Sequence, residues 1–302
     1  MIGPVAGPVA LSEAPWNRAS GGGSGEITTP NHSSFQESRI SAARLDVIAS
    51  GLSSLDRAVV GLVARTRLCS GGQLERLFWS QGQRDSDARQ ARKVLSRLTA
   101  WRLLNRLPRR VGGRRAGSRG FVYCLGPAGI RLLLRETGVR MSRLAAPGDR
   151  YVTHVLSCTE LVVRMEEGTR RGDLDVIEIQ GEPECWRGFL GPFGAQLLLK
   201  PDLFVRIGVG ALEDRWMIEV DLATEARGTL TAKFKRYLAH YQSGAEQRDH
   251  GIYPRVLWAV PNKRRAELVQ EVLRGLPSET ARLVTVGLLD EVVERLQAEA
   301  SS

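Results

Sequence analysis

Residues 84–125 read RDSDARQARKVLSRLTAWRLLNRLPRRVGGRRAGSRGFVYCL, and this stretch decides the expected fold of the first half of the chain. Four apolar residues recur in it at helical spacing: Ala91, Val94, Leu95 and Leu98. They predict a helix over about residues 86–101. The segments 103–107 (LLNRL) and 121–125 (FVYCL) follow, separated by a Gly/Arg-rich turn over residues 109–119. Two short strands around such a turn predict a β-hairpin with a basic tip.

The same stretch carries the excess positive charge of the protein. Between Arg84 and Arg119 there are eleven arginines and Lys93, against only Asp85 and Asp87. The segment therefore has a net charge of +10, equal to that of the whole 302-residue chain. A solvated surface usually mixes both signs to limit self-repulsion. Positive charge concentrated in one segment instead indicates a polyanionic partner.

The surrounding sequence extends the pattern. A helix is expected from residue 55, with Ser54 as its N-cap, and a short helix over about residues 73–79. Another helix begins at Pro127 after the hairpin. Three helices, a hairpin and a helix, in that order, predict a winged helix-turn-helix that binds double-stranded DNA. The expected DNA contacts are Arg89, Arg92, Lys93 and Arg97 on the third helix and Arg109, Arg110, Arg114, Arg115 and Arg119 in the wing.

Composition predicts three parts and a location. Residues 1–50 are rich in Gly, Pro and Ser and predict a disordered tail, followed by the DNA-binding domain at 51–145 and a second domain at 146–302. The four cysteines lie far apart, which argues against a disulfide scaffold and a zinc ribbon and fits reduced thiols. No apolar run approaches the roughly 18–20 residues that span a bilayer. We expect a cytoplasmic protein with no membrane partner.

The second domain has balanced charge and a different pattern. A helix is expected over about 151–167, and strands near 176–179, 195–207 and 216–221. A long helix over about 225–241 and further strands and helices complete the chain. The order α-β-β-β-α-β predicts an α/β sandwich with a mixed sheet.

The carboxylates near the ends of these strands are the candidate metal-binding and catalytic residues. Glu219 and Asp221 share one face of their strand, and Asp202 on the neighbouring strand could meet them. Such a group suits Mg²⁺, which could activate water and stabilise charge on a phosphodiester. Glu160 could add a further ligand. His154 and Cys158 lie four residues apart on a helix, a spacing that could hold a metal, but the sequence shows no further ligand near them.

These motifs carry a family resemblance. The segments Lys200–Asp202 and Glu219–Asp221 resemble the PD-(D/E)xK nuclease superfamily. A winged helix ahead of them resembles the replication-relaxation family of actinobacterial plasmids and mobile elements. That resemblance spans about residues 52–265 and includes Leu125–Gly129, Glu219–Glu225 and Lys233–Tyr237. It implies a restriction-endonuclease-like second domain and a role in plasmid replication or mobilisation.

The chain departs from the nuclease pattern at one position. The superfamily places a lysine two residues after the glutamate, where this chain has Asp221. A lysine from the following helix could replace it, and Lys233 lies nearer the apolar stripe of that helix than Lys235 does. The catalytic residues of a nuclease would then be Asp202, Glu219 and Lys233.

Three functions follow in order of preference. The first is a double-stranded DNA-binding protein of plasmid or mobile-element replication or mobilisation, with a second copy of the chain or replication and mobilisation proteins as partners. The second is a Mg²⁺-dependent DNA endonuclease that uses Asp202, Glu219 and Lys233, with Asp221 as a further metal ligand. The third is a transcriptional regulator whose C-terminal domain senses a signal or dimerises.

Overall fold

A computed structural model describes residues 40–80, 84–107, 120–141, 147–191 and 194–300. The chain is a mixed α/β protein with two principal sheets. Residues 1–39 of the expected tail lie outside the described part. Ala42–Ser50, however, forms helix α1, capped by the side chain of Ser41. The expectation of a tail up to residue 50 is therefore wrong for this segment, because Leu45 and Ile48 bury one face of the helix.

The N-terminal unit (residues 40–137) combines helices with a small antiparallel sheet. Its elements are α1 (Ala42–Ser50), α2 (Ser54–Thr66), β1 (Cys69–Ser70), α3 (Gly71–Phe78), α4 (Arg84–Ala100), β2 (Leu104–Arg106), β3 (Val122–Leu125) and α5 (Pro127–Thr137). The strands lie in the order β1-β3-β2, with both pairs antiparallel. The N-cap of α2 is Ser53, one residue before the predicted Ser54, because Ser53 and Asp56 form a reciprocal capping box.

Two glycines let α5 approach the end of α4. A Cβ atom at Gly126 would lie 2.2 Å from the carbonyl oxygen of Arg102, and one at Gly129 would lie 2.3 Å from that of Leu103. Both distances are far too short for any side chain. The stretch Leu125–Gly129 therefore needs its glycines for close backbone packing.

The C-terminal unit (residues 149–300) is built on a mixed five-stranded sheet. Its elements are α6 (Asp149–Arg171), β4 (Asp175–Gly181), β5 (Arg187–Leu190), β6 (Gln196–Leu199), β7 (Leu203–Val209), β8 (Leu212–Val220), α7 (Arg227–Gln242), α8 (Ala245–His250), β9 (Arg255–Val260), α9 (Lys263–Arg274), α10 (Ser278–Leu283), β10 (Val284–Leu288), η3 (Leu289–Glu291) and α11 (Val292–Ala300). The order is β10-β9-β8-β7-β4. The pairs β4–β7 and β7–β8 are antiparallel, and β8–β9 and β9–β10 are parallel.

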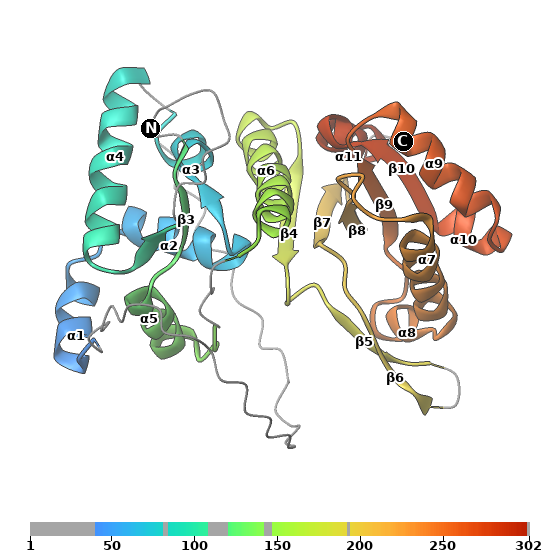
Figure 1. The fold of residues 1–302 in the computed structure, drawn as a ribbon, viewed down its shortest axis with the longest axis horizontal. Helices are drawn as coiled ribbons and strands as arrows, with labels where there is room; N and C mark the ends of the chain where they lie inside the picture. Colours follow the sequence, from blue (N-terminus) through green and yellow to red (C-terminus); the bar gives the residue numbers. More distant parts are fainter. Residues whose placement is uncertain (1–39, 81–83, 108–119, 142–146, 192–193, 301–302) are drawn as a thin grey trace, which may run out of the picture.

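Helices cover both faces of this sheet (Figure 1). Helices α6 and α11 pack on one face, while α7, α9 and α10 pack on the other. The strand expected over residues 195–207 is divided into β6 and β7, because Pro201 between them has no N–H to donate to a ladder. Strand β6 pairs with β5 as a separate two-stranded hairpin.

Helix α6 lies between the small sheet and the five-stranded sheet (Figure 1). Arg76 of α3 forms ion pairs with Glu160 and Glu167 of α6, at 2.5 Å each. The hydroxyl of Thr159 donates to the carbonyl of Leu68 at 2.8 Å. One hydrophobic core runs through both units, so they pack as a single body.

Within the described residues, no single helix is long and apolar enough to cross a membrane, although the bent pair α1–α2 passes that test by combined length and composition.

Candidate nucleic-acid interface and candidate metal centre

Helix α4 separates its apolar and basic residues onto opposite sides. Four of its residues are buried in the core: Ala91, Val94, Leu95 and Leu98. Arg89, Arg92 and Lys93 are exposed. The helix lies at the outer edge of the molecule, away from the five-stranded sheet (Figure 1). The basic face of α4 is therefore accessible to a large partner on the side away from the C-terminal unit.

Arg97 has a different position from the other basic residues of α4. Its guanidinium lies 2.6 and 2.8 Å from the two carboxylate oxygens of Asp56, which is 1% exposed. It also lies over the ring of Trp101, with the Cζ atom 5.3 Å from the centroid. Burial acts to raise the pKa of Asp56, but hydrogen bonds from Ser53 and Arg97 outweigh it and lower that pKa. Arg97 therefore ties α4 to the start of α2, a contact that helical spacing alone did not predict.

The expected wing lies outside the described residues, including Arg109, Arg110, Arg114, Arg115 and Arg119. The strand before it ends with Arg106, whose guanidinium carbon lies 4.8 Å from the ring centroid of Phe121 and 5.8 Å from that of Tyr123. Arg106 thus packs on the two aromatic rings that follow the basic segment.

Asp202 is fixed where strand β7 begins. Its Oδ2 atom accepts a 2.7 Å hydrogen bond from the backbone N–H of Val220, at the end of β8. Its Oδ1 atom lies 2.9 Å from Nε2 of His154 on α6. This hydrogen bond is the leading cause of a raised pKa of His154, which burial opposes. Asp202 therefore links the end of β8 to α6.

Glu219 lies in β8 and is buried, with 2% of its surface exposed. Its Oε2 atom lies 3.1 Å from Nζ of Lys233, and its Oε1 atom accepts a 2.7 Å hydrogen bond from the hydroxyl of Tyr237. Burial and then the charge of Asp202 raise the pKa of Glu219 to about 8, against the opposing effects of Lys233 and Tyr237. The carboxylates of Asp202 and Glu219 are thus near enough to repel each other.

Lys233 is the lysine of α7 that reaches this group, whereas Lys235 is exposed. Its Nζ atom also lies 2.8 Å from Oε1 of Glu225. Burial acts to lower the pKa of Lys233, but Glu219 and Glu225 outweigh it and raise that pKa. The ammonium group is therefore held charged beside the carboxylates.

Asp221 does not join Asp202 and Glu219 as a third carboxylate. It is buried against Arg265 of α9, with 2.7 Å between Arg265 Nη2 and Asp221 Oδ2. The indole N–H of Trp258 also donates to Asp221 at 3.3 Å. The expected ligand role of Asp221 is wrong on this geometry, because a guanidinium already neutralises it. Glu160 is likewise held at the interface by Arg76 and Gln73.

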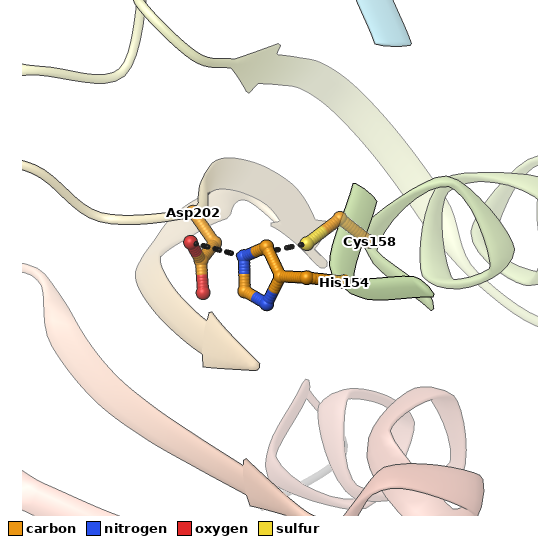
Figure 2. Close-up of side chains that lie close together, drawn as sticks. All are labelled: His154, Cys158 and Asp202. Atoms are coloured by element: carbon orange, nitrogen blue, oxygen red, sulfur yellow. Dashed lines mark hydrogen bonds and ion pairs between the residues drawn. The ribbon is translucent and has the colours of Figure 1, made fainter. Parts of the chain in front are cut away.

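A different set of residues meets the geometric requirement for a metal ion. Within the described part of the chain, ligand atoms of His154, Cys158 and Asp202 lie within 4.8 Å of one another. The sequence shows the two α6 residues by their spacing but not their third partner, because Asp202 lies 44 residues further along the chain than Cys158. Figure 2 shows the three side chains pointing toward one another.

The fold and these sites define a mixed α/β protein with a basic exposed helix in one unit and a buried carboxylate network in the other. Residues 60–256, about two thirds of the chain, match the replication-relaxation family. The chain therefore belongs to the replication-relaxation family. Searches of curated proteins and of solved structures gave no significant match.

Proposed function

We propose that this protein binds double-stranded DNA in the replication or mobilisation of a plasmid or another mobile element. Family membership suggests the biological process. The observation that carries DNA binding is the exposed basic face of α4, formed by Arg89, Arg92 and Lys93. Arginine suits this role because its planar guanidinium can hold phosphate oxygens or guanine in a bidentate manner.

The N-terminal unit would bind DNA as a winged helix-turn-helix. Helices α2, α3 and α4 and the antiparallel sheet β1-β3-β2 follow the element order of that fold, with the basic segment between β2 and β3 as the wing. In this fold the third helix enters the major groove. Helix α4 would then read base edges, while arginines 109–119 would contact the backbone. Helix α4 lies at the side of the molecule away from the five-stranded sheet (Figure 1).

The test compares two triple variants of the full chain on a pool of random-sequence duplexes. The first changes Arg89, Arg92 and Lys93 to alanine. The control changes three exposed basic residues of α9 to alanine: Lys263, Arg264 and Arg274. Fluorescence anisotropy should show roughly ten- to a hundredfold weaker binding for the α4 variant and near-normal binding for the control. Equal loss in both would contradict a role for α4.

A strong preference of the unaltered protein for one duplex over the pool would favour the alternative of a transcriptional regulator. Selection from a random-sequence library followed by sequencing measures this preference directly.

A metal-dependent DNA endonuclease is the second candidate, favoured by the contact of Lys233 with Glu219 beside Asp202. Asp202 and Glu219 would hold the Mg²⁺, since burial and then the charge of Asp202 raise the pKa of Glu219, and a divalent cation offsets both effects. Asp221, neutralised by Arg265, does not fit as a ligand. Bound Mg²⁺ would activate water and stabilise charge on the phosphodiester. Lys233 would add positive charge beside the carboxylates.

Supercoiled plasmid separates this candidate from DNA binding alone. The protein is incubated with plasmid in the presence of Mg²⁺, Mn²⁺ or a chelator, and nicked product is measured by gel electrophoresis. A nuclease should lose metal-dependent nicking in Asp202→Asn and Lys233→Ala but keep it in the control Lys235→Ala. Intact plasmid with both ions would exclude the endonuclease and leave DNA binding.

A further inference from the structure

Three side chains of different chemistry converge at the junction of α6 and β7. Nε2 of His154 lies 2.9 Å from Oδ1 of Asp202 and 3.7 Å from Sγ of Cys158. His154 and Cys158 are one helical turn apart on α6, so both face the residue that precedes β7. An imidazole, a thiol and a carboxylate are the three side-chain types that zinc accepts as ligands.

The arrangement is not that of a cysteine–histidine–aspartate catalytic triad. In a triad the nucleophile and the carboxylate contact opposite nitrogens of the imidazole, so that a proton can pass from one side to the other. Here the thiol and the carboxylate both approach the same nitrogen, Nε2. Burial and then the charge of Asp202 also raise the pKa of the Cys158 thiol well above its usual range, which opposes a free thiolate nucleophile.

The distances are those of ligands around one small ion. In a tetrahedral zinc site with bonds of about 2.0 Å to nitrogen and about 2.3 Å to sulfur, the nitrogen and sulfur lie about 3.5 Å apart. A nitrogen and a carboxylate oxygen in such a site lie about 3.3 Å apart. The observed separations of 3.7 and 2.9 Å differ from these values by less than half an ångström. All three ligand atoms lie within 4.8 Å of one another, so the thiol and the carboxylate would have to approach each other to about 3.5 Å when the ion binds.

A small cavity adjoins the three ligands. It has a volume of about 30 Å³, and Arg65, Arg67 and Glu182 also line it. This volume holds one or two water molecules, so a water could fill a fourth coordination position. The site lies where the end of α2 meets the C-terminal unit, so a bound ion would be coordinated at the junction of the two units.

Charges of both signs lie around the three ligands, since Arg65 and Arg67 line the cavity beside them. Burial first, and then the negative charges of Asp202 and Glu182, raise the pKa of the Cys158 thiol. A divalent ion would reverse their effect on the thiol, which would release its proton to solvent and bind as a thiolate. Mg²⁺ prefers oxygen ligands and would not select the sulfur and nitrogen atoms of this set.

We propose that His154, Cys158 and Asp202 bind one zinc ion, with water as the fourth ligand. The site is distinct from the DNA-binding face of α4, but it shares Asp202 with the endonuclease candidate, so zinc bound here would take that carboxylate from a Mg²⁺ site with Glu219. Because two ligands come from α6 and the third precedes β7, the ion would fasten this helix to the start of β7.

Cobalt substitution tests the proposal without an activity assay. Purified protein is stripped with a chelator and titrated with Co²⁺, which produces a thiolate-to-cobalt absorption band in the near ultraviolet only when sulfur is a ligand. One equivalent should produce the band, and Zn²⁺ should abolish it by displacement. Cys158→Ser should remove the band. The control Cys185→Ser, which retains a hydroxyl to donate to the carbonyl of Pro201, should keep it.

His154→Gln provides a second variant, because a third of this side chain is exposed and its loss disturbs the core little. Circular dichroism shows that each variant is folded. In the unaltered protein Zn²⁺ should raise the melting temperature, and the rise should vanish in His154→Gln and Cys158→Ser. A cobalt band that survives in Cys158→Ser, or a protein that forms no such band, overturns the proposal.

Discussion

Two arginines on one helix should respond in opposite ways to replacement by alanine. Arg97→Ala should destabilise the protein and leave its DNA affinity nearly unchanged. Arg92→Ala should weaken DNA binding and leave stability unchanged. The reason is that Arg97 binds the buried carboxylate of Asp56, whereas Arg92 is exposed on the outer face of α4.

The expected loss of stability in Arg97→Ala follows from the burial and hydrogen bonds of Arg97 and Asp56. A hydrogen bond to a charged group contributes about 1.5–3 kcal/mol. Arg97 is 41% exposed, so solvent screening reduces this contribution. The Asp56 carboxylate, 1% exposed, keeps its two hydrogen bonds from Ser53 in the variant. We expect Arg97→Ala to lower the free energy of unfolding by about 1–2 kcal/mol.

Arg92→Ala should instead remove one contact to DNA. The loss of a bidentate arginine–base contact costs about 1–3 kcal/mol, which corresponds to roughly five- to 150-fold in affinity for the preferred sequence. Urea denaturation measures the first effect, and fluorescence anisotropy on a selected duplex measures the second. If Arg97→Ala weakened DNA binding as much as Arg92→Ala and kept full stability, the structural assignment of Arg97 would be refuted.

Two further predictions concern stability. Gly129→Ala should lower the free energy of unfolding by about 1–3 kcal/mol, because the added Cβ would meet a backbone carbonyl. Gly61→Ala, in the open interior of α2, should raise the free energy of unfolding by about 0.5–1 kcal/mol. Equal urea midpoints for the two variants would contradict this prediction. Burial, and then Arg187, lower the pKa of His240 to about 4 from 6.5. The unfolded chain therefore takes up a proton before the folded chain does, so stability should fall as pH decreases from 6.5 towards 4. His240→Gln should reduce this loss of stability at low pH. If the urea midpoints of the variant and the unaltered protein depended on pH in the same way, the role of His240 would be contradicted.

Helices were the part of the fold that the sequence predicted best. The helices expected over residues 73–79 and 86–101 are found at 71–78 and 84–100, because the spacing of buried apolar residues fixes a helix within a turn. The hairpin β5–β6 was missed. The sequence predicts no strand over the residues of β5, and it joins those of β6 to β7, since an apolar run alone does not show where a chain leaves one sheet for another.

The candidate sites were predicted less completely, because periodicity gives the face on which a residue lies but not its partner. Helical periodicity predicts that Lys233 points toward the carboxylates, and Lys233 does contact Glu219. Strand periodicity also groups Asp221 with Glu219, but the guanidinium of Arg265, 44 residues later, holds Asp221 elsewhere. The contact of His154 with Asp202 depends in the same way on how α6 packs against the sheet.

The salt dependence of DNA binding by the full chain tests the central proposal most directly. Dissociation constants for a random-sequence duplex are measured over a range of salt concentrations, for the unaltered protein and for the variant with alanine at Arg89, Arg92 and Lys93. If about five to eight phosphates are neutralised, the logarithm of affinity should fall with the logarithm of salt at a slope of roughly −4 to −7. The variant should have a slope shallower by up to about 2–3 units. A slope near zero, or the same steep slope in both proteins, would contradict DNA binding through α4.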